Sequence, residues 1–217
     1  IGIIDGKGRQ VPGDLLTAFL AKDVAARHPG APILLDVKSS EAALRLVESA
    51  GAAAQIWKTG HSHMKKRMKE LEAPLAGEMS GHIFIADDYL GFDDAIYAAV
   101  RVITQMVNGG QSITEFMDSL PEQHATPELR IDCPDTVKFD SMEKIRAHVL
   151  SGHDAADVNS IDGVRVRSGD GWWLIRASNT EAALVARAEA ADRTALDRLL
   201  GDIETTLAAA GFDWKRP

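Results

Sequence analysis

Residues 172–181 read Trp172-Trp173-Leu174-Ile175-Arg176-Ala177-Ser178-Asn179-Thr180-Glu181. The apolar start of this stretch predicts a buried strand, and a guanidinium, two hydroxyls and an amide follow it closely. A phosphate dianion suits such a cluster, because arginine offers a planar fork while hydroxyls and backbone amides fill the remaining lone pairs. The stretch is also compatible with a polar turn between strands that carries an incidental arginine.

A second polar run, Gly77-Glu78-Met79-Ser80-Gly81-His82, lies between the apolar residues 75–76 and 83–85. Its two glycines let the backbone turn tightly and approach a ligand closely. The carboxylate and the hydroxyl between them can bind vicinal sugar hydroxyls, and the histidine can exchange a proton near neutral pH. The alternative is a hairpin with a structural histidine. Together, the two runs predict a site for a ligand that is both polyhydroxylated and phosphorylated.

At six places in order along the chain, the sequence resembles the α-D-phosphohexomutases, in particular their phosphomannomutase/phosphoglucomutase branch. The two runs above resemble the sugar-binding and phosphate-binding loops of that family. The family has four domains, and the resemblance covers only the third and fourth, which form the C-terminal half. The other four matches are Leu35-Asp36-Val37-Lys38, Trp57-Lys58-Thr59-Gly60-His61-Ser62, Gly91-Phe92-Asp93-Asp94-Ala95-Ile96-Tyr97 and Asp162-Gly163-Val164-Arg165-Val166.

The resemblance implies an enzyme that moves phosphate between C1 and C6 of a hexose through a phosphoserine and a bisphosphorylated intermediate. It implies that Glu78, Ser80 and His61 bind the sugar. It further implies that Lys38 and His82 act at the reacting centre, His82 as the proton shuttle. The alternatives are a surface lysine at a strand end and a histidine that donates structurally to the sugar loop. By the same resemblance, the phosphate site consists of Arg176, Ser178, Asn179 and Thr180.

The sequence lacks two loops of the family, the phosphoserine loop of the first domain and the metal loop of the second. The run Asp5-Gly6-Lys7-Gly8-Arg9 is superficially similar to the metal loop, but its lysine would repel a divalent metal. The run is instead typical of a hairpin turn. We therefore expect magnesium to be bound by the missing second domain and no metal to be bound by this chain. The expected partners are a hexose phosphate and the N-terminal half of the same enzyme, without which this chain is expected to be inactive.

Composition narrows the class of protein further. The formal net charge of −8 argues against nucleic acid as a partner, because phosphate backbones require basic surfaces. No apolar run is long enough to span a membrane and no signal peptide is present, so we expect a cytoplasmic protein with no membrane partner. The single cysteine, Cys133, excludes an internal disulfide framework. The first residue is isoleucine, which fits a fragment of a longer chain.

Strand and helix patterns alternate up to residue 120 and predict an α/β domain with a mixed, mostly parallel sheet, preceded by a short remnant of the second domain. Asp14 is positioned to cap one helix, and either Asp93 or Asp94 another. Prolines and polar residues at 121–127 predict a hinge. Over 128–217, consecutive strands with helices at both ends predict a small α+β domain with an antiparallel sheet.

Two other functions remain open, a non-catalytic phosphosugar-binding module and a folded fragment that holds no ligand. The position of Met79 favours the mannose/glucose branch, because the phosphoglucosamine mutase branch tends to carry glutamine there. The sequence does not distinguish mannose from glucose, since both sugars share their stereochemistry at O3 and O4.

Overall fold

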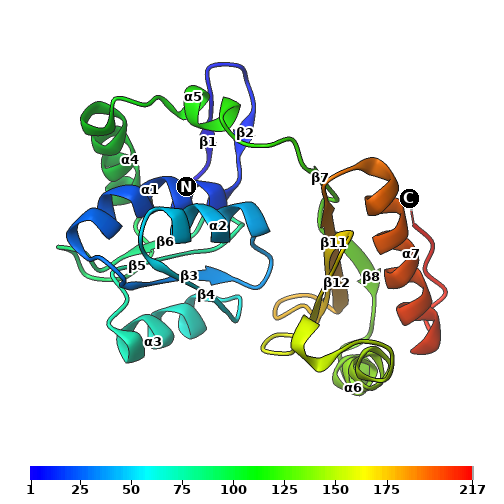
Figure 1. The fold of residues 1–217 in the computed structure, drawn as a ribbon. Helices are drawn as coiled ribbons and strands as arrows, with labels where there is room; N and C mark the ends of the chain where they lie inside the picture. The colour runs from blue at the N-terminus through cyan, green and yellow to red at the C-terminus, as the bar shows by residue number, and fades with distance from the viewer. Residues whose placement is uncertain (217) are drawn as a thin grey trace. The chain divides into compact units, whose positions relative to one another are not determined.

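The first unit of the fold is built on a four-stranded sheet in the order β4-β3-β5-β6. The computed structural model describes residues 1–216, which fall into two units, 1–121 and 122–216 (Figure 1). Strand β3 pairs in parallel with β4 and β5, and β5 pairs antiparallel with β6, so the predicted mixed, mostly parallel sheet is confirmed. The elements are β1 (Ile3–Ile4), β2 (Gln10–Val11), α1 (Gly13–Arg27), β3 (Pro32–Asp36), α2 (Glu41–Ser49), β4 (Ala53–Trp57), α3 (His61–Leu71), β5 (Leu75–Gly77), β6 (Ile83–Ile85), α4 (Ala95–Gly109) and α5 (Ile113–Asp118).

Helices cover both faces of this sheet. Successive side chains of a strand point to opposite sides, and in this sheet the side chains on both sides are apolar and need to be buried. In β3, Ile33 and Leu35 join the apolar cluster formed with α1, α2 and α4. Leu34, between them, joins a second cluster with Met64 and Met68 of α3. All three β3 side chains are fully buried. Such near-continuous apolar strands are typical of sheets that are covered on both faces.

Two glycines let α1 lie directly against the loop 77–82. A Cβ atom at Gly13 would lie 2.3 Å from the carbonyl oxygen of Glu78 and 2.4 Å from the backbone nitrogen of Gly81. A Cβ atom at Gly77 would lie 1.8 Å from Oγ1 of Thr17. The backbone N–H of Gly13 also donates to the carbonyl of Met79 over 3.0 Å. Contact this close is possible only without side chains at both positions.

Of the two helix caps expected from aspartates, one is wrong and one is confirmed. Helix α1 begins before Asp14, so its carboxylate does not cap that helix, and the prediction was wrong. Asp14 instead accepts the backbone N–H of Ser40 over 2.6 Å, which joins α1 to the start of α2. Of the two candidates at α4, Asp94 is the cap and accepts from the backbone N–H groups of Ile96 and Tyr97.

The run from Asp5 to Arg9 is a hairpin turn, as predicted. Strands β1 and β2 pair antiparallel on either side of it. The carboxylate of Asp5 accepts the backbone N–H groups of Lys7 over 2.9 Å and Arg9 over 2.8 Å. It also forms an ion pair with the Arg9 guanidinium. These contacts make Asp5 the centre of the turn and account for its burial.

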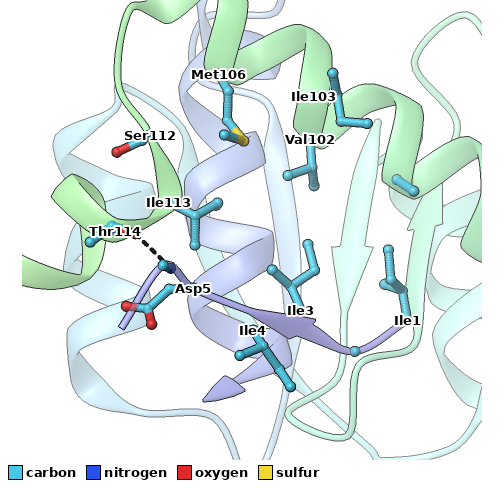
Figure 2. Close-up of a pocket in the computed structure, with 13 residues that line it drawn as sticks. Ile1, Ile3, Ile4, Asp5, Val102, Ile103, Met106, Ser112, Ile113 and Thr114 are labelled. Atoms are coloured by element: carbon cyan, nitrogen blue, oxygen red, sulfur yellow. Dashed lines mark hydrogen bonds between the residues drawn. The ribbon is translucent and has the colours of Figure 1, made fainter. Parts of the chain in front are cut away.

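Helix α4 has apolar residues on two faces. Ala98 and Val102 are buried in the unit. A cavity of about 430 Å³ lies between this helix, the start of α5 and the β1–β2 hairpin. In Figure 2, Val102 and Met106 of α4 face the hairpin across this space, and Ile103 lies at its rim. A second row is largely solvent-exposed and consists of Ile96, Val100, Ile103 and Val107.

The second unit has a mainly antiparallel sheet in the order β7-β12-β11-β10-β9, with β8 also paired to β12, as expected for an α+β domain. Helices α6 and α7 share an apolar cluster with one face of this sheet. On the other face, the buried guanidinium of Arg165 lies 3.8 Å from the ring centroid of Trp172. The elements are β7 (His124–Ala125), β8 (Leu129–Asp132), α6 (Asp135–Gly152), β9 (Val158–Asn159), β10 (Val164–Ser168), β11 (Gly171–Ala177), β12 (Ala183–Ala190) and α7 (Arg193–Ala209), with a 3₁₀ turn at Ala155–Asp157.

Strand β7 falls inside the segment 121–127 that was expected to be a hinge, and it pairs with the end of β12. Residues 124 and 125 therefore belong to the sheet of the second unit. Over residues 1–216, every helix is too short or too polar to cross a lipid bilayer.

Replacing Gly13 with alanine should destabilise the first unit by about 1–3 kcal/mol, because the added Cβ would overlap the backbone of residues 78–81. Urea unfolding of this chain measures the change. Gly2→Ala is the matched control, since a Cβ there meets no atom within 4 Å. Equal unfolding midpoints for the two variants would contradict the close packing of α1 on this loop.

Candidate functional site

Three loops at the carboxyl ends of parallel strands meet at Asp36, the last residue of β3. Its Oδ1 accepts the hydroxyl of Ser39 over 2.8 Å and the backbone N–H of Met79 over 3.0 Å. Its Oδ2 accepts the hydroxyl of Thr59 over 3.0 Å and lies 3.9 Å from Nζ of Lys38. The loops after β3, β4 and β5 are thus joined through one buried carboxylate. Ligand sites of open α/β sheets form at this edge.

Glu78 and Ser80, the predicted sugar-binding pair, flank Met79, whose backbone N–H donates to this aspartate. Glu78 is 3% exposed, and its Oε1 accepts the backbone N–H of Gly60 over 3.0 Å. The Ser80 hydroxyl lies 3.4 Å from the other carboxylate oxygen. Burial raises the pKa of Glu78 above its usual value, and the nearby carboxylate of Asp36 raises it further. A carboxylate and a hydroxyl side by side can hold two neighbouring hydroxyl groups of a ligand.

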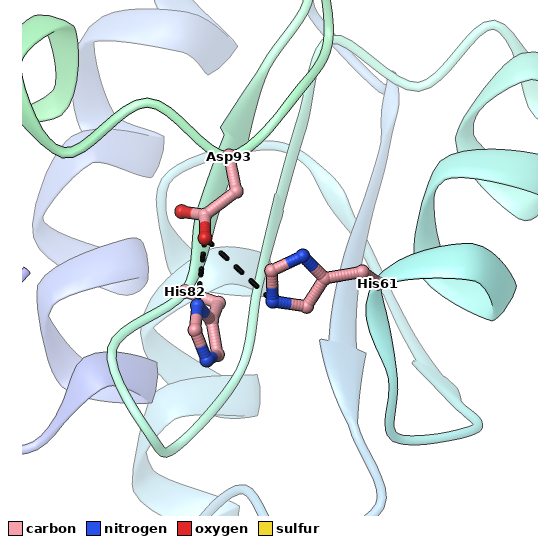
Figure 3. A group of neighbouring side chains, drawn as sticks. All are labelled: His61, His82 and Asp93. Carbon is pink, nitrogen blue, oxygen red and sulfur yellow. Dashed lines mark hydrogen bonds and ion pairs between the residues drawn. The ribbon is translucent and has the colours of Figure 1, made fainter.

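His82 and His61 share one carboxylate oxygen. In Figure 3, the two histidines and Asp93 point toward one another from the end of the loop 77–82, the start of α3 and the segment before α4. Nδ1 of His82 lies 2.7 Å from Oδ2 of Asp93, and Nε2 of His61 lies 3.6 Å from the same oxygen. The two rings meet edge to face, with their centroids 4.2 Å apart.

The contact with Asp93 selects a tautomer of His82. A carboxylate at Nδ1 requires the proton to sit on that nitrogen when the ring is neutral. The Nε2 atom of His82 then carries a lone pair and can accept a proton from a hydroxyl group. In this tautomer the neutral ring donates from Nδ1 and offers Nε2 as its acceptor, and the predicted role of His82 as a proton shuttle stays a prediction.

In the second unit, the predicted phosphate-binding arginine is held by a carboxylate. Arg176 lies near the end of β11, is buried, and donates from Nε to Oδ2 of Asp162 over 3.1 Å and from Nη2 to Oδ1 over 3.4 Å. Gly163, which follows Asp162 in the chain, has a φ of +83°, and a Cβ there would lie 2.6 Å from Cβ of Arg176. Glycine at this position lets the Asp162 turn approach the arginine closely.

Ser178 organises the loop that follows. Its hydroxyl accepts the backbone N–H groups of Thr180 over 3.3 Å and Glu181 over 3.1 Å. Asn179 and Thr180 are exposed at the tip of this turn. From α6, the buried Nζ of Lys138 donates to the carbonyl oxygens of Ser178 over 2.9 Å and Glu181 over 3.0 Å. Lys138 also forms an ion pair with Asp135 over 2.5 Å, so its three N–H donors all have partners and the lysine supports the loop from within the unit. The exposed polar groups of Asn179 and Thr180 are the ones that can contact an anion.

The structure thus collects the predicted residues into two groups, one in each unit. Lys38, His61, Glu78, Ser80 and His82 lie at the sheet edge of the first unit. The four predicted phosphate ligands follow β11 in the second. The sequence analysis had given no role in the site to the residues that support these groups, although three of them stand inside its matching motifs. The supporting residues are Asp36, Asp93, Lys138 and Asp162.

Two family models match this chain. Residues 12–124 match Phosphoglucomutase/phosphomannomutase, alpha/beta/alpha domain III, and residues 128–206 match Phosphoglucomutase/phosphomannomutase, C-terminal domain. The chain belongs to the phosphoglucomutase/phosphomannomutase family. The resemblance inferred from six motifs is therefore confirmed, including its restriction to the third and fourth domains of the family.

Individual relatives agree with this membership. The chain is 41% identical to Phosphomannomutase/phosphoglucomutase of Pseudomonas putida over 95% of its own length and 44% of that protein. It is 36% identical to Phosphoglucomutase of Neisseria gonorrhoeae over 92% of its own length and 43% of that protein. A crystal structure of a phosphoglucomutase/phosphomannomutase family protein from Burkholderia thailandensis superposes with a TM-score of 0.87 at 36% identity, covering 98% of this chain and 45% of that one. The chain spans less than half the length of these relatives.

Glu78→Gln should stabilise the chain at neutral pH. The folded state raises the pKa of Glu78, so the protonated side chain is the form that the fold favours. Its contribution to the free energy of unfolding is fully present below the pKa of about 4.5 in the unfolded chain, and it is lost as pH rises through the raised pKa of the folded state. Glutamine keeps an acceptor for Gly60 and does not ionise. Urea unfolding at several pH values should give equal stabilities near pH 4 and a growing advantage for the variant toward pH 7. Glu48→Gln, at an exposed position of α2, is the control, and a variant less stable at every pH would contradict the argument.

Lys138→Met should loosen the turn at 178–181 while leaving the unit folded. The variant removes two charge-assisted hydrogen bonds to carbonyl oxygens and the ion pair with Asp135. Backbone amides of the turn should then exchange about tenfold faster with solvent. Hydrogen exchange measured by NMR reports each amide separately. Lys144→Met, at an exposed position of the same helix, is the control. Unchanged exchange at Thr180 and Glu181 would show that Lys138 does not hold the turn.

Proposed function

We propose that this chain is the C-terminal portion of a phosphomannomutase/phosphoglucomutase. The whole protein would interconvert hexose 1-phosphate and hexose 6-phosphate through a phosphoserine and a bisphosphorylated intermediate. The observation that carries the proposal is the pairing of a sugar-type site with a phosphate-type site in a chain of this family. Either site alone would suit many ligands, whereas both together suit a phosphosugar.

The geometry suggests a division of labour. Glu78 and Ser80 would bind two sugar hydroxyls, and these contacts can persist when the intermediate turns over. His82, with His61 beside it, would exchange the proton of the attacking hydroxyl, and Lys38 would lie near the reacting oxygen. Holding the phosphate that does not react positions the one that does, which is where most catalysis of phosphoryl transfer originates. Binding of the phosphate that does not react is assigned to Arg176, Ser178, Asn179 and Thr180.

The other parts of the enzyme lie outside this chain in the proposal. Magnesium would be bound by the second domain of the whole protein, and none by residues 1–217. The N-terminal half would be the macromolecular partner, and the exposed apolar row on α4 offers a surface for it. The cytoplasmic location expected from the sequence stays a prediction.

A structure of Aspergillus fumigatus N-acetylphosphoglucosamine mutase in complex with GlcNAc-6P and magnesium, at 16% identity and a TM-score of 0.67, shares the fold alone.

Binding without catalysis is the second candidate for the isolated chain. The Glu78–Ser80 pair and the Ser178 turn each form from residues of a single unit. Neither therefore needs the N-terminal half in order to take its shape. The chain by itself would then be a phosphosugar-binding module with no mutase turnover.

An NMR titration of this chain with glucose 1-phosphate, and separately with inorganic phosphate, tests both statements. We expect glucose 1-phosphate to shift amides in both loops and inorganic phosphate to shift only residues 176–181. Arg176→Lys should weaken both ligands by about tenfold or more, because lysine cannot replace the planar fork. Arg193→Lys, at an exposed position of α7, is the control.

Absence of saturable shifts would contradict binding by this chain alone. Turnover of glucose 1-phosphate by a preparation free of the N-terminal half would contradict the assignment of the phosphoserine to that half. The two outcomes are independent of each other.

A further inference from the structure

We propose that His61, His82 and Asp93 form a binding site for a Zn²⁺-class transition-metal ion. Each residue offers one ligand atom, and the three atoms lie within 4.8 Å of one another. The residues come from three segments, α3, the loop before β6 and the segment before α4, so their meeting is a product of the fold (Figure 3). All three are partly exposed, which gives an ion and its water ligands access from solvent.

The donor set selects the kind of ion. Two imidazole nitrogens and a carboxylate oxygen with open positions suit Zn²⁺ and its neighbours in the transition series. Magnesium prefers oxygen ligands in a strict octahedron and keeps its waters, so this set would bind it poorly. The proposed site is therefore distinct in chemistry from a magnesium site.

The present geometry is close to what such an ion needs. Ligand atoms about 2.0–2.1 Å from a tetrahedral ion lie about 3.3 Å from one another. The carboxylate oxygen of Asp93 is now 2.7 Å from Nδ1 of His82 and 3.6 Å from Nε2 of His61. The first separation must widen by about 0.6 Å and the second shorten by about 0.3 Å, while the two nitrogens, which lie within 4.8 Å of each other, must also come to about 3.3 Å. The three side chains are partly exposed, so rotations about their χ angles can make these changes without displacing the core.

A bound ion would alter what His82 can do. The metal would replace the proton on Nδ1 that now faces Asp93. The remaining nitrogen, Nε2, would then carry the only ring proton of the neutral imidazole. The ring could donate a hydrogen bond but could no longer accept a proton. A Zn²⁺-class ion would thus act as an inhibitor of any proton exchange by His82, although its binding does not depend on the proposed function.

Titration of this chain with Zn²⁺ by calorimetry, and with Co²⁺ followed by its visible absorption, tests the site. We expect one saturable site for each ion, and no comparable binding of Mg²⁺. His61→Ala and Asp93→Asn should each weaken Zn²⁺ by at least about tenfold, the scale of losing even a supporting partner of a metal ligand. His63→Ala, at an exposed position of the same helix, should bind as the parent does.

The amide spectrum of each variant checks that it is folded. Asparagine at position 93 can still accept the backbone N–H of Ile83, so this variant should keep the local structure. Absence of saturable Zn²⁺ binding would overturn the proposal. Binding that both His61→Ala and Asp93→Asn leave unchanged would also overturn it, because the ion would then lie elsewhere.

Discussion

The carboxylate of Asp36 is the contact on which the first unit's polar edge depends. Strands β3, β4 and β5 each end at this edge, and a group from each following loop hydrogen bonds to that carboxylate. Loops at the carboxyl ends of strands have few apolar contacts to hold them, so their order must come from hydrogen bonds. Because Asp36 is fully buried, its bonds are shielded from water and are stronger than surface bonds would be. The positions of the Glu78 loop and of the loop before α3 follow from this arrangement.

The two groups of polar residues obtain their order by opposite electrostatic means. In the first unit, Glu78 is buried near another carboxylate, and this environment disfavours its charge. In the second, Arg176 and Lys138 are buried with acceptors around them, which compensates their charge. The first arrangement leaves a carboxylate ready to bind hydrogen-bond donors. The second keeps two cations inside the unit without leaving them unpaired.

The sequence predicts this fold well because its signals are local. Alternation of strands and helices, the turn at residues 5–9 and the cap at Asp94 all depend on residues close together in the chain. Asp14 was misjudged because its partner, Ser40, is 26 residues away and helix α1 begins earlier than its pattern indicates. The prediction of a hinge failed to anticipate β7, a two-residue strand that is formed only by pairing with β12. A polar segment with prolines gives no local sign of such a pairing.

For the same reason, the sequence predicts only some of the residues of the candidate site. Contiguous motifs identified the residues that would touch a ligand. The residues that orient them lie 11 positions away in the case of Asp93 and His82, and 40 positions away in the case of Lys138 and Ser178. These pairs exist only once the chain is folded, and nothing in the spacing of the residues predicts them.

The pairing of Arg176 with Asp162 has a consequence for selectivity. An arginine side chain loses about 2 kcal/mol of rotational entropy when it is fixed, and here folding has already fixed it. An arriving anion therefore meets a guanidinium that does not need to be ordered, but it must also tolerate a neighbouring carboxylate. Attraction by the guanidinium and repulsion by the carboxylate both grow in proportion to the charge of the anion, so the aspartate weakens every anion's contact with this arginine. Because Nε and Nη2 of the guanidinium already face Asp162, the aspartate fixes the direction from which a ligand can approach the arginine, and selection would be by the shape of the ligand.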